Sequence, residues 1–204
     1  MHVAIVVLLG IASGQGLWML SQRRAAQLGN RSAASSIWLG TLFGFAASLL
    51  ALAFAGNGWN DVEAAPLLAA LLIMAVTDLF DERYVYDVVS IPAVVYTLAI
   101  SIANGRTIEG LIGAALGCAL GFGLQAALPI FGGADVYGLI LLCTAFGWAQ
   151  GWFACVLALL VAALATVRGL RIPRAPAPLF VGIVVAVLVG MRGGFEPVIH
   201  AYVR

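Results

Sequence analysis

Eight long apolar runs, separated by short polar segments, account for most of the chain. They are Val3–Leu20, Ala34–Ala55, Ala64–Phe80, Val88–Ala103, Ile108–Phe131, Val136–Trp148, Trp152–Val167 and Leu179–Met191. A helix needs about 20 residues to cross a bilayer. The sixth and eighth runs are shorter than this, so seven spans, or a re-entrant segment, remain alternatives. We predict an all-α, polytopic transmembrane helix bundle of about eight helices.

The composition places this bundle in a membrane. Of the 204 residues, 63% are hydrophobic and only 9% are charged, and lysine is absent. Soluble domains average about 25% charged residues, so a chain with so few could not cover its surface with them. The polar segments are too short to form an extramembrane domain, and none carries a basic run that would suggest a nucleic-acid partner. We therefore expect a single transmembrane domain over residues 1–204, surrounded by membrane lipid.

The distribution of arginine predicts the orientation of the bundle. With eight spans, the segments after the first, third, fifth and seventh runs lie on one side. That side holds seven arginines, and the other side holds three: Arg23, Arg24, Arg31, Arg83, Arg168, Arg171 and Arg174 against Arg106, Arg192 and Arg204. Positively charged residues accumulate in cytoplasmic loops. The sequence thus predicts a multi-pass protein of the inner (cytoplasmic) membrane, with the seven-arginine side in the cytoplasm.

Two features of the apolar runs have simple packing explanations. Gly113, Gly117 and Gly121 recur every four residues along the fifth run, a spacing that lets a neighbouring helix approach closely. The cysteines lie inside apolar runs and form no C-x-x-C pair: Cys118, Cys143 and Cys155. Their spacing indicates neither a zinc site nor a disulfide framework, so we expect them to be buried small residues.

Carboxylates at membrane depth carry the candidate chemistry, because a charge is costly there and needs a purpose. Asp78 lies near the end of the third run and Asp135 just before the sixth, and two crossings of the bilayer separate them. The topology therefore places both carboxylates at the cytoplasmic face, where neighbouring helices could bring them together. Asp87 starts the fourth run on the same face, but an aspartate there is also explained as a helix cap.

A pair of carboxylates at a site of low dielectric constant suits acid–base catalysis. Both cannot ionise easily, so the pair retains one proton. In an aspartic protease, the ionised carboxylate takes a proton from water and the neutral one donates to the scissile carbonyl. Gly132 and Gly133 would permit an unusual backbone turn and the close approach of an extended substrate. A simple glycine turn, with Asp135 capping the sixth helix, explains the same residues without chemistry.

Two segments together resemble the type IV prepilin peptidase family: "GGAD" at 132–135 and "TDLFDERYVYDVVSIP" at 77–92. That family consists of polytopic membrane aspartic proteases of the GxGD class, related to the archaeal preflagellin peptidases. The resemblance spans residues 64–190, because "PAPLFVG" at 176–182 is similar to a proline-containing stretch before the family's last helix. It implies that Asp78 and Asp135 are catalytic and that Gly132, Gly133 and Ala134 form the active-site loop.

The resemblance also implies a reaction. A member of this family would cut the leader peptide from a prepilin or pseudopilin substrate at the cytoplasmic face, just before the substrate's N-terminal hydrophobic helix, in type IV pilus assembly or protein secretion. Water is the nucleophile in that reaction, so neither a metal nor an organic cofactor is implied. Larger members carry a cytosolic domain with paired cysteines between the first two spans. The short segment here argues against their second activity, N-methyltransferase.

The sequence leaves three alternatives open. Tyr86-Asp87, followed by the GGAD segment, also resembles the presenilins and signal peptide peptidases, which would make Asp87 catalytic in place of Asp78. A buried aspartate pair could instead relay protons in a proton-coupled transporter or channel. Finally, Ala134 and Tyr137 stand where the prepilin peptidases usually have glycine and lysine. These departures allow a catalytically inactive relative that acts as a pilus or secretion assembly factor.

Overall fold

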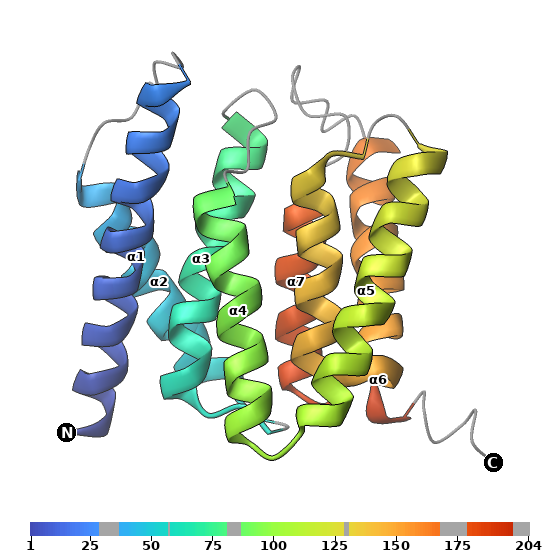
Figure 1. Ribbon diagram of the computed structural model, residues 1–204. Helices are drawn as coiled ribbons and strands as arrows, with labels where there is room; N and C mark the ends of the chain where they lie inside the picture. The colour runs from blue at the N-terminus through green and yellow to red at the C-terminus, as the bar shows by residue number, and fades with distance from the viewer. Residues whose placement is uncertain (29–36, 57, 81–86, 129–130, 168–178, 198–204) are drawn as a thin grey trace.

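The computed structural model describes residues 1–28, 37–56, 58–80, 87–128, 131–167 and 179–197. Within these residues it contains helices and no strand: α1 (His2–Gln27), α2 (Ile37–Phe54), α3 (Asp61–Phe80), α4 (Asp87–Ala103), α5 (Thr107–Ala127), α6 (Gly133–Val167) and α7 (Leu179–Met191). The helices stand side by side, and α1 through α5 alternate in direction (Figure 1). The predicted all-α bundle is confirmed.

The element labelled α6 is a hairpin of two helices. Gly147 interrupts it with φ 74° and ψ 179°, a backbone conformation that is almost confined to glycine. Residues as far apart as Cys143 and Cys155 would be separated by about 18 Å along a continuous helix, yet their Sγ atoms are 3.5 Å apart. The chain therefore reverses at Gly147 (Figure 1). The two arms match the predicted runs Val136–Trp148 and Trp152–Val167. When the arms are counted separately, the number of helices in the described chain is close to the predicted eight.

The outside of the bundle suits a lipid environment. Four helices of the described chain are long and apolar enough to cross a membrane: α1, α3 over Asp61–Leu79, α5, and α6 over Gly133–Ala165. The length of α6 is divided between its two arms. Three further apolar helices are shorter: Trp38–Phe54, Asp87–Ala103 and Leu179–Met191. Large apolar side chains such as Leu8, Phe122 and Leu160 point away from the core and are exposed. Lipid would cover such side chains, whereas water would not favour them.

α3 is the central helix of the bundle. It contacts α1, α2, α4 and α7. Of its apolar stretch, 61% is buried, against 22–28% for the other long helices. Leu67, Leu71 and Met74 are among its fully buried side chains. Because Asp78 lies in the last turn of α3, the most buried of the long helices positions this carboxylate.

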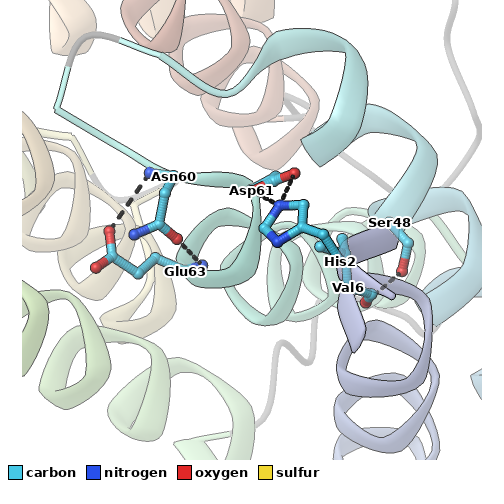
Figure 2. Close-up of polar contacts among 6 residues, drawn as sticks. All are labelled: His2, Val6, Ser48, Asn60, Asp61 and Glu63. Carbon is cyan, nitrogen blue, oxygen red and sulfur yellow. Dashed lines mark hydrogen bonds and ion pairs between the residues drawn. The ribbon is translucent and has the colours of Figure 1, made fainter. Parts of the chain in front are cut away.

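Polar contacts fix the start of α3. Asn60 Oδ1 accepts a hydrogen bond from the Glu63 backbone N–H at 2.9 Å, and Glu63 Oε2 accepts one from the Asn60 N–H at 3.5 Å (Figure 2). This reciprocal arrangement is a capping box. The neighbouring Asp61 pairs with His2 Nε2 at 2.8 Å, which ties the start of α1 to the start of α3. Ser48 Oγ donates to the Val6 carbonyl at 3.2 Å and joins α2 to α1.

The glycine stripe of α5 packs against the first arm of α6. A Cβ atom on Gly117 would lie 2.5 Å from Ile140 Cα, and one on Gly121 would lie 2.7 Å from the Val136 side chain. A Cβ on Gly113 would meet the Cys143 carbonyl. Real side chains do not approach backbone this closely, so these positions require glycine. The predicted close approach of a neighbouring helix at this stripe is confirmed.

The described arginines divide between the two ends of the bundle. Arg23 and Arg24 lie near the C-terminal end of α1, which is at the same end as Asp78 (Figure 1). Arg106 precedes α5 and Arg192 follows α7, both at the opposite end. The remaining arginines lie outside the described residues: Arg31, Arg83, Arg168, Arg171, Arg174 and Arg204. The contrast between the two ends therefore rests on the sequence as well as on the fold.

Candidate active site

Asp78 and Asp135 lie at the same end of the bundle. Asp78 belongs to the last turn of α3 and Asp135 to the first turn of α6, and these two helix ends are on the same side in Figure 1. The carboxylates are close enough for their charges to repel each other. Both side chains are half-buried. The fold thus brings together two carboxylates that are far apart in the sequence.

The first turn of α7 reaches Asp78. The Phe180 backbone N–H donates a hydrogen bond to the Asp78 carboxylate. The first N–H groups of a helix have no partner within the helix, and its positive dipole end attracts an anion. The other carboxylate oxygen, Oδ2, is buried and has no hydrogen-bond partner within the described part of the chain. Because such an oxygen costs about 1–3 kcal/mol, stability alone gives no reason for a carboxylate at this position.

Asp135 helps to hold the start of α6. Its Oδ2 accepts a hydrogen bond from the Gly132 backbone N–H at 2.8 Å. The third residue of the helix therefore caps the residue just before the helix, as in one half of a capping box. This hydrogen bond confirms the simpler explanation that Asp135 caps the start of α6. The bond uses one carboxylate oxygen, which is compatible with a second role for the residue.

Open space surrounds the two glycines before Asp135. A Cβ on Gly133 would meet nothing within 4 Å, and one on Gly132 would meet only Asp135 Oδ2, at 3.7 Å. Neither glycine has a positive φ, so the backbone does not require glycine here, contrary to the expectation of an unusual turn. The open space beside these two glycines leaves room for an approaching substrate chain. Ala134 is half-buried and packs against the hydrophobic core.

Asp87 occupies a different position from the other two aspartates. It is the first residue of α4 and is exposed, at a helix start where the dipole stabilises a negative charge. Tyr86, its partner in the presenilin-like motif, lies outside the described residues. Among the described residues, no three His, Cys, Asp or Glu side chains are grouped so that they could hold a metal ion.

Sequence reasoning found α7 but not its part in the site. The apolar run Leu179–Met191 predicted the helix, and residues 179–182 of the proline-containing segment form its first turn. Residues 176–178 of that segment lie outside the described chain. The contact between Phe180 and Asp78 depends on how α7 packs beside α3. One local signal in the sequence was Gly138, a glycine close to Asp135. In the structure a Cβ on Gly138 would lie 2.5 Å from Ile183 Cδ1, so this glycine lets α7 approach α6.

A family comparison covers the segment that carries both aspartates. The model of the type IV leader peptidase family matches residues 65–167, just over half of the chain. The chain belongs to the type IV leader peptidase family. The match runs from α3 to the second arm of α6 and includes Asp78 and Asp135. Comparison with curated proteins and with solved structures gave no significant match.

Membership in the leader peptidase family fixes the general function. The protein is a multi-pass membrane protease, and its substrates are of the type IV prepilin kind. The resemblance inferred over residues 64–190 is confirmed over 65–167. The matched segment of this leader peptidase ends before α7. The contribution of the Phe180 N–H to the candidate site is therefore a finding of the structure.

Proposed function

We propose that this leader peptidase is an aspartic endopeptidase whose catalytic pair is Asp78 and Asp135. One observation carries the proposal: two half-buried carboxylates, from the ends of α3 and α6, lie close enough to repel each other in a protein of a peptidase family. Substrates would be prepilin or pseudopilin chains. Cleavage would occur at the cytoplasmic membrane face, just before the N-terminal hydrophobic helix of the substrate.

The mechanism follows from sharing one proton between two carboxylates. Repulsion and partial burial disfavour two negative charges at this site, so one carboxylate keeps its proton. The ionised carboxylate takes a proton from water as the water attacks the scissile carbonyl, and the neutral one donates a proton to the carbonyl oxygen. The N–H groups of Phe180 and Gly132 hold the two side chains in place. The reaction assigns no role to a metal or a cofactor.

The surroundings of the pair suit an extended substrate. The backbone at Gly132 and Gly133 has open space beside it, which allows a substrate strand to lie along the active-site loop with Ala134 behind it. The arginine distribution supports a cytoplasmic position for this end of the bundle. N-methyltransferase activity is not part of the proposal, since the segment between α1 and α2 is short.

Cleavage by the purified protein tests this proposal. The full chain in detergent is incubated with a prepilin-like peptide that contains a leader and the start of the hydrophobic segment, and the products are identified by mass spectrometry. We expect Asp78→Asn and Asp135→Asn each to lower the cleavage rate by about 10²–10⁴-fold or more, since each removes an acid–base group. Asp61→Asn makes the same change at the opposite end of the bundle and should retain cleavage.

The asparagine variants also separate the alternatives. Asparagine keeps one carbonyl oxygen that can accept the hydrogen bonds from Phe180 and Gly132, so the helix ends should remain in place. A proton-coupled transporter would cleave nothing, and would lose proton flux in liposomes on the same substitutions. An inactive assembly factor would show neither cleavage nor flux. Wild-type protein that leaves the peptide uncut would contradict the proposed function.

A further inference from the structure

Two of the three cysteines are neighbours inside the α6 hairpin. The Sγ atoms of Cys143, on the first arm, and Cys155, on the second arm, lie 3.5 Å apart. Both side chains are buried, with 0% and 2% of their surface exposed. The third cysteine, Cys118, lies on α5 and is only half-buried. The spacing in the sequence did not indicate the pair, because the pair depends on the reversal of the chain at Gly147.

The arms of the hairpin are close enough at this level for a covalent link. A Cβ on Gly151, one turn before Cys155, would lie 2.6 Å from Cys143 Cα. Glycine at this position therefore lets the two backbones meet beside the cysteines. A disulfide needs backbones that are close together and sulfurs about 2.0 Å apart. Small rotations of the two side chains would bring the sulfurs from 3.5 Å into bonding distance.

We propose that Cys143 and Cys155 form a disulfide that joins the two arms of α6. The two S–H bonds break and one S–S bond forms, with the release of two protons and two electrons. A lipid-soluble quinone accepts both protons and both electrons and becomes a quinol. A quinone suits this site because it dissolves in the lipid that surrounds the apolar bundle in which the two thiols lie.

The position of the pair in the membrane favours the oxidised form. Cys143 lies about 6 Å along the helix from the reversal at Gly147, and Gly147 is at the opposite end of the first arm from Asp135. If Asp135 faces the cytoplasm, as proposed above, the cysteines lie in the outer half of the bilayer. Disulfides form and persist on the outer side of the cytoplasmic membrane. The pairing itself does not depend on the peptidase mechanism.

The disulfide would stabilise the scaffold of the site. The first arm of α6 carries Asp135 at its start. The second arm packs against α7, since a Cβ on Gly182 would meet the backbone of Ala158, and α7 supplies the Phe180 N–H to Asp78. Fixing the arms to each other therefore restrains both catalytic carboxylates. We expect reduction to lower the unfolding temperature of the wild-type chain and to leave that of Cys155→Ser unchanged.

Counting free thiols tests the disulfide directly. Membranes that contain the full chain are treated with a short-chain ubiquinone and dissolved in denaturant with excess iodoacetamide, and the intact mass is measured. We expect one alkyl group, on Cys118, and three after prior reduction. The variant Cys118→Ser should carry no alkyl group before reduction and two after it. A digest of the unreduced chain should contain the peptides of Cys143 and Cys155 joined to each other.

A matched variant makes the result specific to this pair. Cys155→Ser should carry two alkyl groups with or without reduction. Three alkyl groups on the unreduced, quinone-treated wild type would overturn the proposal. So would a disulfide that includes Cys118. Neither result would bear on leader cleavage, which the peptide assay measures separately.

Discussion

The surroundings of Asp78 are unfavourable for a carboxylate that serves only the stability of the fold. Asp78 lies at the end of the most buried of the long helices, one of its oxygens has no partner within the described chain, and the charge of Asp135 acts against its own. The Phe180 N–H offsets part of this penalty. Functional sites commonly retain such unfavourable arrangements because activity needs them. A carboxylate kept for structure would instead be expected to have its hydrogen bonds satisfied.

The stability of Asp78→Asn should therefore be higher than that of the wild type. Asparagine is neutral, so it removes the cost of holding either the shared proton or a second negative charge beside Asp135, and the expected gain in the free energy of unfolding is about 1–2 kcal/mol, or a few °C in unfolding temperature. Thermal unfolding of the purified protein in detergent measures it. Asp87→Asn, at an exposed position, should change the unfolding temperature little. A lower unfolding temperature for Asp78→Asn would indicate that the carboxylate serves the fold.

A substitution at Gly133 tests substrate binding without disturbing the fold. Because a side chain there meets nothing within 4 Å, Gly133→Leu should leave the unfolding temperature almost unchanged. The added side chain would occupy the space where an extended substrate is proposed to lie, so we expect a rise in KM of at least about tenfold, equivalent to about 1.4 kcal/mol of binding. Peptide cleavage kinetics measure the change. Gly123→Leu, at an equally open position on α5, is the control and should cleave normally.

At the scale of the elements, hydrophobic runs predicted helices well and their packing less well. The runs that end at Trp148 and begin at Trp152 anticipated the α6 hairpin, since hydropathy identifies each crossing separately. The glycine stripe of α5 predicted close contact but could not identify the partner, which is the first arm of α6. The length of α1 was underestimated, because the helix continues past Arg23 and Arg24 to Gln27. Charged residues at a membrane surface do not end a helix.

The contact between α5 and α6 should be sensitive to a single methyl group. A Cβ on Gly117 would lie 2.5 Å from Ile140 Cα, so Gly117→Ala forces two backbones apart. We expect the unfolding free energy to fall by about 1–3 kcal/mol, the usual cost of overpacking. Gly123→Ala, on the same helix but facing open space, should not be destabilising. Equal unfolding temperatures for the two variants would contradict the close backbone contact.

At the scale of the molecule, the order of the predicted membrane crossings was the most informative feature of the sequence. Counting crossings was enough to place Asp78 and Asp135 at one end, because each crossing reverses the side of the membrane. Long-range contacts were not predictable in the same way. The His2–Asp61 pair, the Phe180 N–H at Asp78 and the sulfur contact in α6 each join segments whose neighbours the sequence does not specify. Local sequence patterns determine where the helices form, whereas the packing of the whole bundle determines these contacts.

The orientation of the bundle can be measured in intact cells. Gln27, in the last turn of α1 at the same end of the bundle as the end of α3, and Glu196, which follows α7 at the opposite end, are both exposed. A membrane-impermeant maleimide added from outside should label Glu196→Cys and leave Gln27→Cys unlabelled until the membrane is permeabilised. The chain without an added cysteine gives the background. Labelling of Gln27→Cys alone would place the aspartates on the outer face and contradict the arginine-based orientation.

Cleavage of a substrate in cells tests which two aspartates form the catalytic pair. A prepilin-like substrate is co-expressed with the wild type, Asp78→Asn, Asp87→Asn or Asp135→Asn, and the N-terminus of the substrate is determined by mass spectrometry. We expect loss of the leader with the wild type and with Asp87→Asn, and an intact leader with the other two variants. Removal of the leader by Asp78→Asn, together with an uncut leader in Asp87→Asn, would contradict the proposed pair and assign the first catalytic role to Asp87.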